Sequence, residues 1–158
     1  QTSVESKVFE TRDAIKNGAG EIDYVVDLVA IKSGDWAYVE DEMYRITSTC
    51  RELGADCKVI FETCYLTDEE KERLCEIACR VHPTFIKTST GFGTPAPGAP
   101  NGATIEDIRL MKRCVGDEVL IKASGGIRTT EQALNMLEAG ASRIGTSNGV
   151  AIVEGFVE

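Results

Sequence analysis

The sequence has 158 residues, 42% of them hydrophobic and 27% charged, and a formal net charge of −9. This length and composition predict one globular domain with a buried core and exclude global disorder. The negative charge argues against nonspecific binding to nucleic acid or anionic lipid, and no apolar run approaches the ~20 residues that cross a bilayer. Because the polar start of the sequence is unlike a signal peptide, we expect a soluble, cytoplasmic protein.

Five short apolar segments predict strands, and four of them follow a glycine by a few residues. A glycine at this point ends a helix, because it adopts the left-handed conformation at low cost. The segments are rich in Val and Ile, as buried parallel strands are. The predicted strands comprise residues 22–26, 58–62, 85–88, 120–123 and 143–145.

The segments between these strands carry helix signals. Helices are predicted at about 4–17 and 36–53, and further helices after Thr67, Thr104 and Thr129. The segments that begin at Thr67 and Thr129 match a capping box, in which the threonine and a Glu or Gln three residues later satisfy free backbone N–H groups. Strands that alternate with helices form a parallel sheet covered by helices.

Two architectures contain such a sheet, the open doubly wound sheet and the closed eight-stranded barrel. Dinucleotide binding by an open sheet would need a GxGxxG motif directly after a strand, and the nearest candidate, Gly91-Phe92-Gly93, lacks the third glycine. Polar residues gather at the carboxyl ends of several strands, which favours the barrel. We therefore predict an α/β fold of the (β/α)8 TIM-barrel type, of which this sequence covers about five βα units.

Two lysines stand in matching positions, Lys87 in FIKTSTGFG and Lys122 in LIKASGGIR. Each ends a short apolar strand and precedes a turn rich in Gly, Ser and Thr. Burial and a neighbouring cation both favour the neutral amine of a lysine, which is a nucleophile. Two lysines that converge on one cleft would indicate Schiff-base chemistry. The alternative is that both side chains extend from the strand ends into solvent.

Strand alternation places the carboxylate of Asp23 on the face opposite Tyr24, toward the barrel axis. A carboxylate there is costly unless it is paired, so Asp23 is either a proton shuttle near a lysine or half of a buried ion pair. Lys58 and Glu62 share a face of the next strand. We expect them to form a structural ion pair, the alternative being an extension of the charged network.

The turns after three strands carry candidate substrate-binding groups. The hydroxyls after Lys87 could hold substrate or water, and a double glycine before a helix lets backbone N–H groups approach an anion. Adjacent turns after the last two strands are where barrels often bind phosphate. Arg128 either assists or is merely exposed. The candidate binding residues are Thr88, Ser89, Thr90, Gly91, Gly125, Gly126, Arg128, Gly145, Thr146 and Ser147.

Metal and histidine chemistry are not indicated. The six cysteines form no CxxC pair, so we expect no metal site and buried, reduced thiols. The only histidine, His82, lies far from the glycine-rich turns in sequence, which argues against a Ser-His or Cys-His mechanism. The proline-rich segment 91–103 is either a lid over the site or a tolerated insertion.

The segments GEIDYVV, KVIFETCYLTDEEK, FIKTSTGFGT, ATIEDIRLM, IKASGGIRT and SRIGTSNGVAIVE resemble the deoxyribose-phosphate aldolases, a class I family of (β/α)8 barrels. The resemblance implies reversible cleavage of 2-deoxy-D-ribose 5-phosphate to acetaldehyde and D-glyceraldehyde 3-phosphate, without a metal or organic cofactor. It also implies that Lys87 forms the Schiff base, Lys122 is the cation that activates it, and Asp23 moves protons through bound water.

Two features depart from that family. Its members are longer, with about three more βα units in front, so we expect residues 1–158 to be a single barrel domain, incomplete at the N-terminus and cut short at the C-terminus. The alternative is a partial barrel that associates with another copy as a homo-oligomer. The segment TPAPGAPNG replaces a shorter glycine-rich link. Competing functions are a Schiff-base aldolase for another phosphorylated sugar and an inactive truncated product that binds sugar phosphate.

Overall fold

Five parallel strands form one sheet in the computed structural model, which describes residues 2–156. The strands are β1 (Glu21–Val25), β2 (Asp56–Ile60), β3 (Phe85–Lys87), β4 (Leu120–Ser124) and β5 (Arg143–Gly145). They neighbour one another in sequence order, and each pair is parallel. This confirms the predicted parallel sheet, although β2 begins and ends two residues earlier than predicted.

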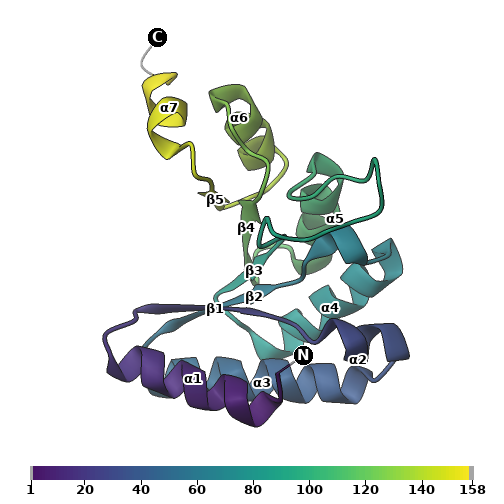
Figure 1. The fold of residues 1–158 in the computed structure, drawn as a ribbon, viewed down its shortest axis with the longest axis vertical. Helices are drawn as coiled ribbons and strands as arrows, with labels where there is room; N and C mark the ends of the chain where they lie inside the picture. The colour runs from purple at the N-terminus through teal and green to yellow at the C-terminus, as the bar shows by residue number, and fades with distance from the viewer. Residues whose placement is uncertain (1, 157–158) are drawn as a thin grey trace.

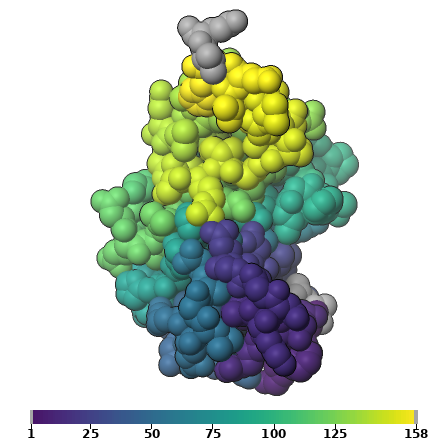
Figure 2. All heavy atoms as spheres, turned by 90° about the vertical axis from the view of Figure 1, so that its left-hand side faces the viewer, coloured from purple at the N-terminus to yellow at the C-terminus, as the bar shows by residue number. Residues whose placement is uncertain are grey.

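Helices lie around the outside of the strands (Figure 1). They are α1 (Val4–Lys16), α2 (Leu28–Ser33), α3 (Trp36–Glu52), α4 (Asp68–Val81), α5 (Ile105–Val115), α6 (Thr130–Glu138) and α7 (Gly149–Glu154), with a 3-10 turn at Thr63–Tyr65. Helix α1 packs on α3, and α4 packs on α5. The first helices and the last helix lie at opposite ends of the molecule (Figure 2). The five predicted helices are thus confirmed, and α2, α7 and the 3-10 turn are additional.

Both predicted capping boxes are present. The backbone N–H of Glu70 donates to the Thr67 hydroxyl, and the Thr67 N–H donates to the Glu70 carboxylate at 2.8 Å. Thr129 and Gln132 make the same pair of bonds at the start of α6. Because these bonds fix where α4 and α6 begin, they also fix the ends of the preceding turns.

The two faces of the sheet differ in chemistry. One face carries buried apolar side chains such as Val59, Ile86 and Ile121, which pack beneath the helices in the hydrophobic core. The strand register pairs Asp23 with Lys58 and Lys87 with Lys122. Side chains alternate along a strand, so these charged residues share the other face. The inner face of the curved sheet is therefore charged.

Glu62 does not extend the inner face of β2 as predicted. The strand ends at Ile60, and Glu62 adopts a left-handed conformation with φ of 56° before the 3-10 turn. Its carboxylate accepts a hydrogen bond from the backbone N–H of Thr90 at 3.0 Å. The expected ion pair with Lys58 is therefore wrong, because the backbone turns away before Glu62 can face that lysine.

His82 and the cysteines lie outside the charged face. His82 caps the carboxyl end of α4 and precedes β3, so it lies at the amino ends of the strands, away from the glycine turns. All six cysteines are free. Within residues 2–156, no group of His, Cys, Asp and Glu has the arrangement of a metal site. No helix in the same range has the length and apolar character needed to span a bilayer.

Candidate active site

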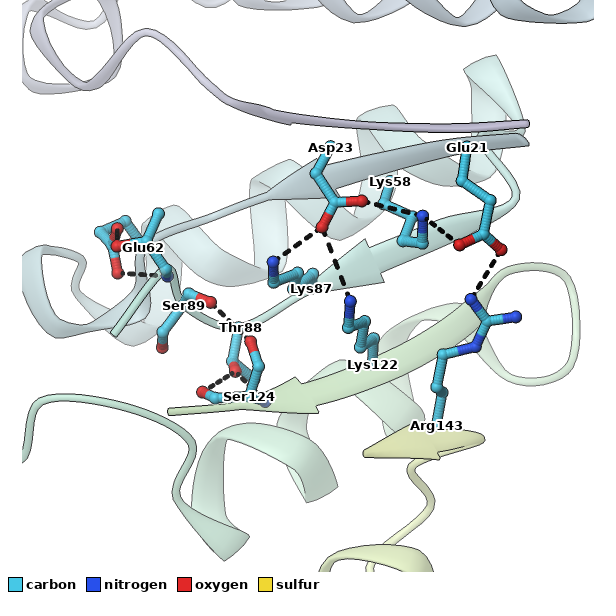
Figure 3. A network of polar contacts seen from close by, with 11 residues as sticks. Glu21, Asp23, Lys58, Glu62, Lys87, Thr88, Ser89, Lys122, Ser124 and Arg143 are labelled. Atoms are coloured by element: carbon cyan, nitrogen blue, oxygen red, sulfur yellow. Dashed lines mark hydrogen bonds and ion pairs between the residues drawn. The ribbon is translucent and has the colours of Figure 1, made fainter. Parts of the chain in front are cut away.

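Three charged side chains from three strands meet on the inner face of the sheet. The ammonium nitrogen of Lys87 lies 2.7 Å from Oδ2 of Asp23, and that of Lys122 lies 3.6 Å from the same oxygen (Figure 3). The side chains of the two lysines are largely buried, whereas about a third of the Asp23 side chain is exposed. The structure thus brings together the three residues that the sequence singles out, and neither lysine simply extends into solvent.

The charges in this cluster shift one another's protonation. Burial by itself would raise the pKa of Asp23, but hydrogen bonds from Lys58 and Lys87 lower it to about 2. Burial lowers the pKa of Lys122, and the positive charge of Lys87 lowers it further, against the opposing effect of Asp23. Asp23 is therefore a carboxylate at neutral pH, and Lys122 releases its proton more readily than an ordinary lysine.

The low pKa of Asp23 predicts a pH dependence of stability. The folded-state pKa of about 2 lies below the ordinary value of 3.8, so its ionised form stabilises the fold above that value. This contribution, on the order of 1 kcal/mol because the side chain is partly exposed, is lost as the pH falls from about 4 to 2. We expect the difference in free energy of unfolding between the wild-type protein and Asp23→Asn to shrink between pH 6 and pH 2.5. Urea denaturation at several pH values measures it, and a constant difference would contradict the prediction.

A cavity of about 390 Å³ adjoins the two lysines at the carboxyl ends of β3, β4 and β5. Both lysines line it, together with the turns that follow the three strands. Gly125 and Gly126 have φ of 87° and 77°, a conformation that suits glycine and lets their backbone approach a ligand. The lining residues are Lys87, Thr90, Gly91, Phe92, Lys122, Ser124, Gly125, Gly126, Ile127, Arg128, Gly145, Thr146 and Ser147. Eight of the ten predicted binding residues are in this set.

Thr88 and Ser89 do not line the cavity, in contrast to the prediction. The Thr88 hydroxyl donates to the carbonyl of Ser124 at 3.0 Å and accepts from its backbone N–H at 3.1 Å. Ser89 is buried, and its carbonyl accepts a hydrogen bond from the Ser124 hydroxyl. These two residues tie the end of β3 to the end of β4, and Ser124 faces the cavity instead. Ser124 lies two residues after Lys122, so alternation could have found it.

The proline-rich loop between β3 and α5 returns against the double-glycine turn. The backbone N–H of Ala103 donates to the carbonyl of Gly125 at 3.1 Å. A Cβ atom on Gly102 would lie 2.5 Å from the carbonyl carbon and oxygen of Gly125, and 3.1 Å from its Cα. At the start of the loop, Gly91 also lies beside Gly125. The position of the cavity wall therefore depends on glycine at residue 102.

Replacing Gly102 with alanine should destabilise the protein by about 2–4 kcal/mol, because the backbone conformation and the contact with Gly125 both oppose a Cβ atom. Gly98 is a matched control in the same loop, since its φ is also positive, at 86°, but nothing lies within 4 Å of an added Cβ atom. Gly98→Ala should cost only about 1 kcal/mol. Chemical denaturation measures both, and equal losses would show that the Gly102 contact is unimportant.

The family model of the DeoC/LacD family aldolases matches residues 1–154. The chain belongs to this family. A deoxyribose-phosphate aldolase of Lactobacillus acidophilus is 54% identical over 154 residues, which cover 98% of this chain and 62% of that protein. The chain spans just under two thirds of the length of the curated relatives it matches.

Solved structures of aldolases share the fold. The structure of QR15, an aldolase, superposes with a TM-score of 0.88 at 43% identity, covering 99% of this chain and 67% of that chain. A tetrameric deoxyribose phosphate aldolase from Aeropyrum pernix superposes with a TM-score of 0.85 at 29% identity, covering 100% and 64%. These similarities confirm the TIM-barrel prediction, with the five βα units forming part of the barrel.

A second layer of charges in this aldolase-family site was only partly predicted. The ammonium of Lys58 lies 2.8 Å from Oδ1 of Asp23 and 2.8 Å from the carboxylate of Glu21. Arg143 in turn lies 2.7 Å from the other carboxylate oxygen of Glu21. Lys58 thus extends the charged network, the alternative considered for it from the sequence. Glu21 could have been found by alternation, because it lies two residues before Asp23.

Proposed function

We propose that the protein is a Schiff-base aldolase that reversibly cleaves 2-deoxy-D-ribose 5-phosphate to acetaldehyde and D-glyceraldehyde 3-phosphate. The observation that carries this proposal is the pair of largely buried lysines, Lys87 and Lys122, on one oxygen of Asp23 beside a cavity with glycine turns. The names of the curated relatives support the same reaction. The chemistry requires only amines, a carboxylate and water.

In the first step, the neutral amine of Lys87 attacks the C1 aldehyde of the open-chain sugar. The resulting carbinolamine takes up a proton through bound water, loses water and becomes a protonated imine. We assign Lys122 to this step as the second cationic group beside Lys87, on the same oxygen of Asp23. We assign the nucleophile to Lys87 from its position in the FIKTSTG motif, and its nitrogen is also the nearer of the two to Oδ2 of Asp23, at 2.7 Å against 3.6 Å.

In the second step, the imine accepts the electron pair of the C2–C3 bond. The hydroxyl on C3 loses its proton, D-glyceraldehyde 3-phosphate departs as an aldehyde, and an enamine remains on Lys87. Protonation at C2 gives the imine of acetaldehyde, which water hydrolyses to release acetaldehyde and the amine. With a pKa of about 2, Asp23 is a weak base. We therefore assign proton exchange to Asp23 and Lys122 together, through bound water.

The substrate phosphate is assigned to the wall of the cavity that the glycine turns form. The turns at Gly125-Gly126 and Gly145-Thr146-Ser147 both line it, and α6 begins just after the first turn. Backbone N–H groups and the amino end of a helix attract an anion. Arg128 lines the same wall and adds a full positive charge. This wall explains how a chain with a net charge of −9 would hold a phosphate.

The tetrameric relative from Aeropyrum pernix supports a further proposal, that this protein also forms homo-oligomers. We likewise propose a cytoplasmic location, which fits a reaction on phosphorylated sugars. Light scattering coupled to size-exclusion chromatography measures the oligomeric state directly. A monomer at micromolar concentration would contradict the oligomer proposal.

A cleavage assay tests the proposed function. The protein is incubated with 2-deoxyribose 5-phosphate, and D-glyceraldehyde 3-phosphate is detected by a coupled dehydrogenase. Unphosphorylated 2-deoxyribose should have a value of kcat/KM lower by about 100-fold or more, because the phosphate-binding wall is left empty. Other aldose and ketose phosphates are compared under the same conditions. Faster cleavage of another sugar phosphate would favour the rival aldolase assignment, and no cleavage of any would overturn the proposal.

The role of Lys122 predicts a change in the pH profile. Replacing Lys122 with leucine removes a cation beside Lys87, so the acid limb of the kcat/KM profile should move to higher pH by about one unit. Lys122→Arg is the matched control, because it keeps the positive charge but does not release a proton. The control should retain the position of the limb while losing kcat. An unchanged profile in Lys122→Leu would remove the activating role.

A further inference from the structure

Lys58 is the most deeply buried cation of the charged cluster. Its side chain is 2% exposed and projects from β2, between β1 and β3. A buried ammonium is costly unless opposite charges surround it. Asp23 and Glu21 of β1 supply these charges, each 2.8 Å from the Lys58 nitrogen. Burying an apolar side chain at this position would cost less free energy than burying a lysine. Lys58 does not line the cavity of the proposed reaction, so it does not contact the substrate there.

The two carboxylate oxygens of Asp23 have separate partners. Oδ1 faces Lys58, whereas Oδ2 faces Lys87 at 2.7 Å and Lys122 at 3.6 Å (Figure 3). A carboxylate held at one oxygen by a buried donor has little freedom to rotate. Lys58 thus aims the second oxygen of Asp23 at the two lysines of the cavity.

Glu21 and Arg143 hold Lys58 from its other side. Glu21 contacts Lys58 with one oxygen and Arg143 with the other, and the Arg143 guanidinium lies 4.4 Å from the centre of the Phe85 ring. Arg143 belongs to β5 and Glu21 to β1, which are at opposite edges of the described sheet. Together with the contacts of Asp23 to Lys58, Lys87 and Lys122, these contacts link side chains from all five strands.

The chemistry of the proposed reaction makes this arrangement useful. In the proposed reaction the nitrogen of Lys87 bonds to the substrate, so its contact with Asp23 changes. Burial would lower the pKa of Lys58, but its hydrogen bonds to Asp23 and Glu21 raise the pKa above the ordinary value. Lys58 therefore stays charged and keeps its contact with Asp23 while Lys87 reacts, and Asp23 stays an oriented carboxylate.

We propose that Lys58, anchored by Glu21 and Arg143, is a positioning residue that fixes the Asp23 carboxylate against Lys87 and Lys122 during the reaction. The inference rests on the proposed function and adds to it a residue that acts only through Asp23. The charged groups around Asp23 are Glu21 on its own strand, Lys58 on β2, Lys87 on β3 and Lys122 on β4, with Lys7 and Glu10 of α1 lining an opening beside it.

The test uses Lys58→Met and the double variant Lys58→Met/Glu21→Gln, which also removes a carboxylate that Lys58 neutralises. We expect kcat to fall by about 10- to 100-fold in both, with KM changed by less than about threefold, because Asp23 is misplaced while the phosphate wall is intact. The acid limb of the kcat profile should move to higher pH, since Asp23 has lost its donor. If the single variant is too unstable to assay, the double variant is used instead. It removes one positive and one negative charge, so the net charge of the cluster does not change.

Lys71→Met is the matched control. Lys71 is also a largely buried lysine between two carboxylates, 3.0 Å from Asp68 and 2.6 Å from Asp107, but it lies between α4 and α5, outside the site. This variant should lose stability while keeping the wild-type kcat and pH profile. Three results would overturn the positioning role. The double variant could keep the wild-type kcat and pH profile, it could fail to fold, or Lys71→Met could show the same shift of the pH profile. Failure of the wild-type protein to cleave the sugar phosphate or form a reducible adduct at Lys87 would instead overturn the proposed function, and the inference with it.

Discussion

Replacing Lys87 with methionine is expected to lower kcat/KM for cleavage of 2-deoxyribose 5-phosphate by at least about 10³-fold, because the group that bonds to the substrate is lost. The same change should abolish covalent trapping. Borohydride added to the wild-type protein with acetaldehyde should reduce the imine and leave a two-carbon increment on Lys87. Peptide mass spectrometry locates the increment, and the Lys87→Met protein should carry none at this site.

Lys16→Met is the control for this experiment, because Lys16 lies exposed in the last turn of α1, far along the chain from the cavity. It should retain wild-type activity and trapping. An increment found on Lys122 rather than Lys87 in the wild-type protein would exchange the roles of the two lysines. Trapping on neither lysine in folded protein would rule out a Schiff base.

Replacing Asp23 with asparagine is expected to lower kcat by about 10²–10⁴-fold, the range for loss of a group that moves protons. Asparagine keeps nearly the same shape but cannot hold the negative charge that faces Lys87, Lys122 and Lys58. Imine formation should survive in part, so acetaldehyde should still be trapped on Lys87. Steady-state cleavage rates and borohydride trapping, measured on the same sample, separate the two steps.

Asp117→Asn is the matched control, because the Asp117 side chain is fully exposed and pairs only with Lys112 on the surface. It should leave cleavage and trapping at wild-type levels. A wild-type kcat in Asp23→Asn would show that the carboxylate of Asp23 serves the fold alone. Loss of trapping together with cleavage would show that Asp23 is needed before the carbon–carbon bond breaks.

Local sequence signals predicted the elements that depend on local structure. The capping boxes at Thr67 and Thr129 gave correct starts for α4 and α6, because they act within one turn of helix. Alternation in β1 correctly separated Asp23 from Tyr24. Helix α2 was missed because its six residues are too few to produce a helical period, although Asp27 caps its start. The left-handed backbone of Glu62 was missed because only glycine signals that conformation clearly.

Site residues that belong to a local sequence motif could be predicted from the sequence. Contacts that depend on the alignment of neighbouring strands could not. The lysines and the glycine turns follow from motifs at strand ends. The pairing of Lys58 with Asp23 depends on the register between β1 and β2, which no local pattern specifies. The link from Arg143 to Glu21 depends on the curvature of the whole sheet, because residues 122 positions apart in sequence meet there. The prediction that Thr88 binds substrate was wrong because its hydroxyl bonds to the backbone of Ser124, a contact between chain segments that no local pattern specifies.

The meeting of Gly91 and Gly102 at Gly125 gives the intervening loop the geometry of an Ω-loop, whose two ends lie together. Lengthening such a loop at its tip costs little closure entropy, since this cost grows only with the logarithm of the loop length. The exposed tip around Ala96–Gly98 can therefore vary in length and sequence while the wall at Gly125 stays in place. Evolution or engineering can use this tip as a replaceable module at the rim of the cavity, leaving the lysines and the turns beneath it untouched.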